Sequence, residues 1–277
     1  MVLPVAAAAH SPLCVTDQNV FFSSSPPIPF GRPGIFDFKY CQFTAIDSNT
    51  GELIWTSALE SVVSSAPLFA FGKIFAVQRI FEVNNGQLST RVADIAQFDL
   101  RTGTPEIIKT IGSAEHEPLI VSDLMIYVTE NRANALELFG NKSKWNSRIG
   151  IEVMDIEDTF SASPAYLRSA LAVVCASSKG RLFALSIEDG STLWSTNLSS
   201  PPLGTIACSH NRVFCLTRDE LVCLSAVGEA VWKKTLGIVE INHLALSESG
   251  TLFYVRRDHL YACSAQDGKE LLRPAFR

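Results

Sequence analysis

Apolar residues in this chain cluster in short runs that are separated by Gly, Asn, Asp and Ser. Residues 73–77 follow Gly72, residues 212–216 follow Asn211, and residues 251–255 follow Gly250. These runs are rich in β-branched and aromatic residues and are too short for ordinary helices. The pattern predicts a chain of short strands joined by tight turns.

One phrase returns along the chain. It reads Ala45-x-Asp47-x-x-x-Gly51-x-x-x-Trp55, and close copies occupy residues 135–145, 184–194 and, one position shorter, 223–232. Two weaker copies carry an aliphatic residue at the Trp position: Asp99 with Gly103 and Ile107, and Ser264 with Gly268 and Leu272. Copies spaced by about 40 residues are typical of the four-stranded blades of a β-propeller.

The phrase is expected to span the hairpin between the third and fourth strands of each blade. Gly at its seventh position supplies the positive φ of a tight turn, and Asp or Ser at the third accepts backbone N–H groups of that turn. Asn141 replaces Gly in one copy and is the next most tolerant residue. Trp is expected to cover the seam between blades as core packing, with a partner for its N–H. The predicted structural residues are Asp47, Gly51, Trp55, Asp99, Gly103, Trp145, Gly190, Trp194, Gly228, Trp232 and Gly268.

The predicted fold class is therefore all-β, a β-propeller of about six four-stranded antiparallel blades. Two architectures fit six copies: a closed ring of six, or part of a ring of seven or eight blades. We expect a single domain over residues 1–277, because blades add to one toroid. The repeat units are expected at residues 1–59, 60–112, 113–151, 152–198, 199–237 and 238–277.

The phrase resembles the pyrroloquinoline-quinone-type repeat of quinoprotein alcohol dehydrogenase-like propellers, over almost the whole chain. That superfamily contains dehydrogenases and non-catalytic members, such as a bacterial outer-membrane assembly lipoprotein. Related repeats occur beside an adenylating enzyme and in luminal domains of stress sensors. The resemblance implies the fold and leaves the activity open.

A quinoprotein dehydrogenase is the disfavoured alternative. The resemblance implies that such a site needs an Asp base, a Glu and an Asn on calcium, a Trp beneath the quinone and two adjacent cysteines. The chain has no adjacent cysteines, and its four Trp all belong to the repeated phrase. Its densest carboxylate group is expected in a solvated loop: Glu152, Asp155, Glu157 and Asp158. No catalytic, cofactor-binding or metal-binding residue is predicted, and no cofactor is expected.

Composition limits the classes of partner and the cellular compartment that we expect for this protein. A net charge of −5 and a pI near 5.6 argue against nucleic acid as a partner. No apolar stretch is long enough to span a membrane, and the start lacks the basic segment of a signal peptide. Seven cysteines without a Cys-x-x-Cys motif favour a reducing, cytoplasmic location, whereas two Asn-x-Ser sequons, at Asn141 and Asn197, would matter only in a secreted chain. Cross-strand disulfides between Cys208 and Cys215, or Cys215 and Cys223, stay open.

Two connections are expected to be long loops, residues 26–39 and residues 80–93. Long loops on a rigid scaffold often carry binding. The first contains three aromatic residues that we predict as a partner contact: Phe30, Phe36 and Phe38. The function that fits best is a non-catalytic protein-interaction scaffold with an unidentified protein partner. The alternative is the propeller portion of a larger protein, as a regulatory domain beside an adenylating enzyme or as a luminal sensor.

Overall fold

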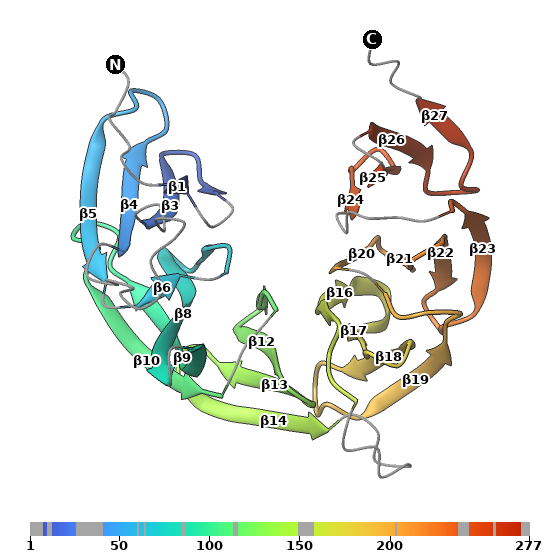
Figure 1. Cartoon of the computed structure of the whole chain (residues 1–277), viewed down its shortest axis with the longest axis horizontal. Helices are drawn as coiled ribbons and strands as arrows, with labels where there is room; N and C mark the ends of the chain where they lie inside the picture. Colours follow the sequence, from blue (N-terminus) through green and yellow to red (C-terminus); the bar gives the residue numbers. More distant parts are fainter. Residues whose placement is uncertain are drawn as a thin grey trace. The chain divides into compact units, whose positions relative to one another are not determined.

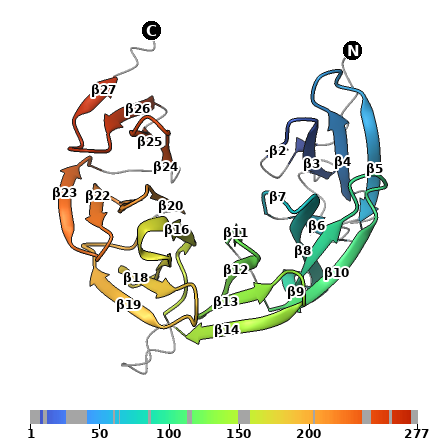
Figure 2. The ribbon, with the colours of Figure 1, turned by 180° about the vertical axis from the view of Figure 1, so that it is seen from behind.

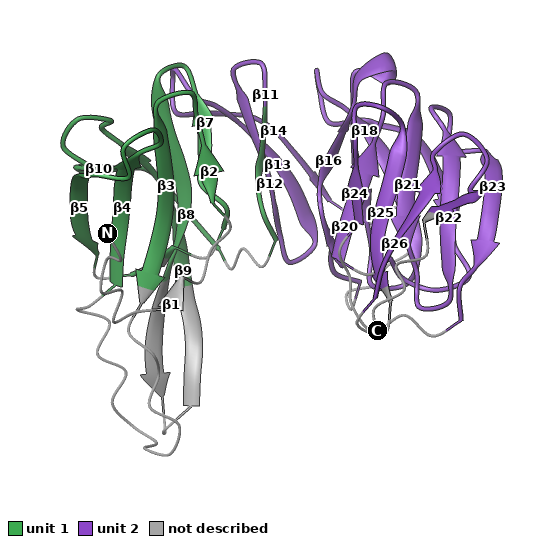
Figure 3. Cartoon of the chain, turned by 90° about the horizontal axis from the view of Figure 1, so that it is seen from above, with its two compact units in different colours: residues 1–120 green, residues 121–277 purple. Residues whose placement is uncertain are grey.

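The computed structural model describes residues 8–9, 13–25, 41–59, 61–63, 65–84, 87–112, 116–148, 158–202, 204–237, 244–256 and 259–272. The chain forms two compact units, residues 1–120 and 121–277 (Figure 3). Within the described residues there is no α-helix, and the one helical turn is the 3₁₀ turn η2 (Arg168–Ala170). The expected single domain over residues 1–277 stays a prediction.

The first unit contains two sheets (Figures 1 and 2). The first sheet has the order β1-β3-β4-β5 with β2 paired to β3, where the strands are β1 (Ala8–Ala9), β2 (Cys14–Val15), β3 (Asn19–Ser25), β4 (Cys41–Asp47) and β5 (Leu53–Leu59). The second sheet has the order β10-β9-β8-β6 with β7 paired to β8, where the strands are β6 (Val62–Val63), β7 (Leu68–Ala70), β8 (Lys73–Asn84), β9 (Gln87–Phe98) and β10 (Pro105–Ile111).

The third and fourth sheets each follow the chain order. The third contains β11 (Leu119–Val121), whose residues straddle the boundary between the units, and then β12 (Leu124–Thr129), β13 (Arg132–Glu137) and β14 (Lys142–Arg148). The fourth contains β16 (Ala165–Leu167), β17 (Ala172–Ala176), β18 (Arg181–Ser186) and β19 (Thr192–Asn197).

The last two sheets complete the second unit. The fifth contains β20 (Gly204–Cys208), β21 (Arg212–Leu216), β22 (Glu220–Ser225) and β23 (Ala230–Thr235), with the short β15 (Ala162–Ser163) parallel to β20. The sixth contains β24 (Leu244–Leu246), β25 (Thr251–Arg256), β26 (His259–Ser264) and β27 (Glu270–Leu272). Six sheets with a four-stranded antiparallel core confirm the predicted all-β propeller class.

One expectation about the loops is wrong. Residues 80–93 were expected to form a long loop, but β8 and β9 stay paired from Ile74↔Phe98 to Asn84↔Gln87. The Asn-Gly sequence between the two strands favours a two-residue hairpin turn, so the ladder can continue up to that turn. The second sheet therefore carries the two longest strands of the fold among the described residues.

The core lies between neighbouring sheets of one unit. In the first unit, Phe43 of β4 packs on Phe98 of β9 with ring centroids 4.5 Å apart, in a buried cluster that draws on both sheets. In the second unit, similar clusters join the fourth sheet to the fifth and the fifth to the sixth. Burying a ring such as that of Phe98 contributes about 2–3 kcal/mol, so the sheets stabilise one another face to face.

Candidate functional site

Each tryptophan of the repeated phrase binds the next repeat inside its own unit. The indole Nε1–H donates to the backbone carbonyl of the fourth residue in the following copy of the phrase. The four bonds are Trp55 to Leu100 O at 2.7 Å, Trp145 to Ile187 O at 2.9 Å, Trp194 to Ala226 O at 2.8 Å and Trp232 to Ala265 O at 3.3 Å. The indoles therefore cover seams between sheets, and each buried N–H is satisfied.

The glycine of the following copy lies directly against each indole. A Cβ at Gly228 would stand 2.6 Å from Trp194 Cε3, and one at Gly268 would stand 3.1 Å from Trp232 Cε3; Gly103 and Gly190 are crowded in the same way by Trp55 and Trp145. All four glycines also have positive φ, between 69° and 82°. Sequence reasoning assigned them to turns only. The close approach of the ring is a second reason for glycine.

The first residue of the phrase also has a role that sequence reasoning missed. It stands directly opposite the Trp position across the hairpin, and the partner strand has a β-bulge directly before the Trp. The pairs are Ala45↔Trp55, Ala135↔Trp145, Ala184↔Trp194 and Cys223↔Trp232. Only small residues occur there, and the recurrence of Ala was the signal that could have revealed this constraint.

The two phrase aspartates hold their turns. Asp47 Oδ1 accepts the backbone N–H groups of Asn49 and Thr50, each at 2.8 Å. Asp99 Oδ1 accepts those of Arg101 and Thr102, each at 2.9 Å. These backbone hydrogen bonds favour the charged form and lower the pKa of both carboxyl groups. Asp47 is partly exposed and Asp99 is exposed, and their hydrogen bonds stay within their own turns, so their role is local turn geometry.

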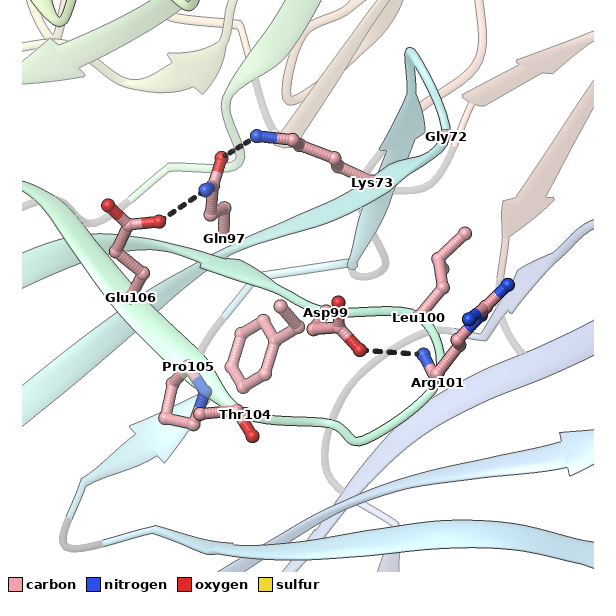
Figure 4. A pocket seen from close by; sticks show the side chains of 10 residues that line it. Gly72, Lys73, Gln97, Asp99, Leu100, Arg101, Thr104, Pro105 and Glu106 are labelled. Atoms are coloured by element: carbon pink, nitrogen blue, oxygen red, sulfur yellow. Dashed lines mark hydrogen bonds between the residues drawn. The ribbon is translucent and has the colours of Figure 1, made fainter.

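The second repeat departs from this plan. Its Ile107 stands at the Trp position and is 49% exposed. The hairpin pairs Gln97↔Glu106 and Ala96↔Ile107, without the bulge that elsewhere precedes the Trp. A polar relay takes the place of the apolar contact: Lys73 Nζ donates to Gln97 Oε1 at 2.9 Å, and Gln97 Nε2 donates to Glu106 Oε2 at 2.5 Å (Figure 4).

This relay borders a shallow hollow of about 500 Å³ in the second sheet. Its lining comes from the start of β8, the end of β9 and the turn into β10 (Figure 4): Gly72, Lys73, Gln97, Phe98, Asp99, Leu100, Arg101, Thr104, Pro105 and Glu106. Its side chains offer exposed cations, carboxylates and an amide. That chemistry suits polar recognition. The lowered pKa of Asp99 keeps it ionised, so it is a poor proton acceptor at neutral pH.

The residues do not fit a quinone cofactor. All four indoles already lie against a glycine and donate to a carbonyl, so no Trp ring is available to stack beneath a quinone. In the part of the chain that the structure describes, no group of three or more His, Cys, Asp or Glu is arranged to hold a metal ion. We derive no chemistry through that cofactor.

One residue of the acidic cluster, Asp158, does not lie in a solvated loop as expected. Asp158 is 6% exposed, and its Oδ1 accepts Ser178 Oγ at 3.1 Å and Lys179 N at 3.2 Å. It fixes the turn between β17 and β18 from the preceding segment. Glu152, Asp155 and Glu157 lie outside the described residues, as do Phe30, Phe36 and Phe38, so the predicted partner contact stays a prediction.

All seven cysteines carry free thiols. Cys215 packs toward the fourth sheet and Cys223 toward the sixth, on opposite faces of the fifth, so these two cannot be bonded to each other. Cys208 and Cys215 share a face but are not bonded. Burial raises the pKa of both Cys208 and Cys215 to about 12, which leaves them protonated and unreactive at neutral pH.

Comparison with known proteins supports the predicted type of repeat. Residues 139–227 match the family model described as outer membrane protein assembly factor BamB. The crystal structure of BamB from Moraxella catarrhalis is similar with a TM-score of 0.65 and 16% identity, over 96% of this chain and 76% of that one. The computationally designed Ika8 protein is similar with a TM-score of 0.55 and 13% identity, over 96% and 86% of the two chains.

No curated protein sequence matches the chain. Among the described residues no helix is long and apolar enough to cross a membrane. The two structural similarities are below 25% identity and therefore speak for the fold, whereas the family match rests on sequence in the third to fifth sheets. The chain therefore has the fold of a β-propeller, as its repeated phrase predicted, and over residues 139–227 its sequence matches the pyrroloquinoline-quinone-type repeat family.

Proposed function

We propose that this protein is a non-catalytic scaffold that binds another protein through the first unit. One observation carries the proposal. Phe71, in the turn between β7 and β8, has φ 52° and a side chain that is 52% exposed. Left-handed backbone costs a bulky residue about 1–2 kcal/mol, and Asn or Gly would form this turn more cheaply.

Phe71 is accompanied by other exposed apolar side chains in the same unit. Phe69 on β7 is 46% exposed, and Leu13 and Val15, at β2, are 59% and 65% exposed. The two strands lie close together, because the backbone of Phe69 is near enough to the Cys14 thiol to oppose the rise of its pKa that burial causes. Large apolar side chains gathered at neighbouring strands are typical of protein-binding surfaces.

Other roles have less support. No particular residue favours a regulatory domain beside an adenylating enzyme or a luminal sensor domain. The engaged indoles speak against a quinoprotein dehydrogenase. The seven free thiols support a reducing compartment, and we keep the cytoplasmic location as a proposal on that ground.

The test is affinity capture from the source extract with the full chain, with Phe71→Asn as the variant. Asn forms the turn readily, so we expect an unchanged or higher melting temperature and at least about tenfold less captured partner, as for a central binding residue. Phe139→Asn is the matched control, because Phe139 is another turn phenylalanine and is 72% exposed. A partner captured equally by all three proteins, or no saturable partner, would contradict the proposal.

A further inference from the structure

One face of the first sheet carries an apolar row that crosses four strands. The register Val15↔Val20, Val20↔Ile46 and Ile46↔Leu53 puts these residues side by side on the same face, because directly paired residues of antiparallel strands share a face. Val15 is 65% and Leu53 is 55% exposed, and the other two are partly exposed. We call this surface the leading face. The opposite face packs on the second sheet.

In other sheets the two middle positions of the equivalent row, those of Val20 and Ile46, are buried, whereas Phe69, at the position of Val15 in the second sheet, is 46% exposed. In the second sheet, Ile74 and Phe98 of that row are 0% and 1% exposed; in the fifth, Val213 and Leu224 are 0% and 2% exposed. In the sixth sheet, Leu252 and Cys263 are both fully buried. In all three, the preceding sheet of the same unit covers the row and its Trp lies over the turn. The row is thus a surface that this repeat normally covers with another blade.

The turn beside the leading face has the same structure as the turns that receive an indole. Gly51 has φ 71°, and its N–H donates to Asp47 O at 2.9 Å; Gly103 has φ 69°, and its N–H donates to Asp99 O at 2.9 Å. A Cβ at Gly103 would strike Trp55, but one at Gly51 would meet nothing within 4 Å. Ser48 is the fourth residue of its copy of the phrase, as Leu100 is of the next copy, and the carbonyl of Leu100 accepts the Trp55 N–H. The turn has the form of an indole socket with space above it.

We propose that the leading face binds a further blade of the same repeat type, supplied by a partner polypeptide, whose Trp lies on Gly51 and donates to the carbonyl of Ser48. A tryptophan is the occupant because the four equivalent sockets of this chain each hold one. A second copy of the chain is not the source, since each of its indoles already donates to a carbonyl of its own. The inference rests on the scaffold function and names its partner class.

The probe is a head-to-tail cyclised peptide of residues 181–197, the hairpin that carries Trp194. Cyclisation fixes the hairpin, which is marginal in water as a linear peptide. Labelled peptide is titrated with the full 277-residue chain, and fluorescence anisotropy reports binding. We expect saturable binding that weakens at least about tenfold when the peptide carries Trp194→Ala.

Three variants of the full chain locate the binding. Gly51→Ala places a methyl group in the socket, and Val15→Asp charges the exposed row; both are expected to weaken binding at least about tenfold. Gly250→Ala is the matched control, because Gly250 has φ 79° and nothing within 4 Å of its Cβ position, so it carries similar backbone strain away from the socket and from Phe71. It is expected to bind like the unaltered chain.

Several outcomes would overturn this inference. They are absence of binding, equal binding by the Gly51→Ala and Gly250→Ala chains, or binding of the Trp194→Ala peptide as tight as that of the unaltered peptide. Self-association that Val15→Asp abolishes, seen by sedimentation, would assign the face to a second copy instead. If partner capture still depends on Phe71 while the peptide does not bind, the scaffold function stands and only the leading-face inference fails.

Discussion

The first and second repeats sit in the same unit and differ at the position that joins repeats. In the first, Trp55 is 7% exposed and lies against Gly103 of the next copy. In the second, Ile107 is 49% exposed, and the next copy of the phrase has Asn141 where glycine is expected. Trp and the following Gly are therefore present together or absent together along the chain.

The reason for this pairing is steric. An indole can approach the turn only if the turn residue lacks a Cβ, because a Cβ would stand within about 3 Å of the ring. Asn141 keeps the positive φ, at 52°, but brings a Cβ. The boundary between the compact units, at residues 120 and 121, falls between these two copies of the phrase. The Trp of one repeat and the Gly of the next therefore form a structural pair, and the repeated phrase specifies this contact between successive repeats.

The largest effect should come from removing an indole. Trp194→Ala should lower the free energy of unfolding by about 3–5 kcal/mol, because it leaves a cavity at the seam and removes the bond to Ala226 O. Ile107→Ala should cost about 1 kcal/mol or less, since half of its side chain is already exposed. Chemical denaturation followed by circular dichroism measures both. Equal costs would show that the seam does not depend on the indole.

The next effect comes from the glycine side of the pair. Gly228→Ala combines a left-handed φ of 82° with a clash against Trp194, and should cost about 2–4 kcal/mol. Gly250→Ala has a similar φ of 79° and open space, and should cost about 1 kcal/mol from strain alone. The double variant Trp194→Ala with Gly228→Ala should cost clearly less than the sum of the two. Additive costs would contradict a coupled pair.

A smaller effect is expected at the first residue of the phrase. Ala184→Val adds two methyl groups directly opposite Trp194, and overpacking of this kind should cost about 1–3 kcal/mol. The matched change is Ala230→Val on β23, an exposed strand position where the added methyl groups meet solvent, so it should cost little. Thermal melts of the two variants compare them. An equal or larger loss at Ala230 would mean that the small residue is not required by the indole.

Sequence alone predicted the strands, the blade type and the repeat, because those follow from local patterns of apolar residues and turn residues. The paired role of Gly190 and Trp145 could not be read in the same way, since the two lie in successive repeats and either has a sufficient local explanation. The polar relay at Lys73, Gln97 and Glu106 was equally hidden. It depends on the position of a bulge, which in this hairpin follows Ile107 instead of preceding the Trp position, and composition does not encode such a detail of register.

The smallest effect distinguishes turns held by aspartate from turns held by serine. The folded-state pKa of Asp99 lies below its ordinary value of 3.8, so its contribution is present above pH 3.8 and is lost as pH falls further through the folded-state pKa. Ser225 accepts the equivalent turn N–H groups and does not titrate in this range. Amide hydrogen exchange should therefore quicken at Gly103 relative to Gly228 below about pH 4, and Asp99→Asn should remove that difference. Equal pH dependence at both glycines would mean that the carboxylate does not hold the turn, and that the second repeat departs from the others only at its seam.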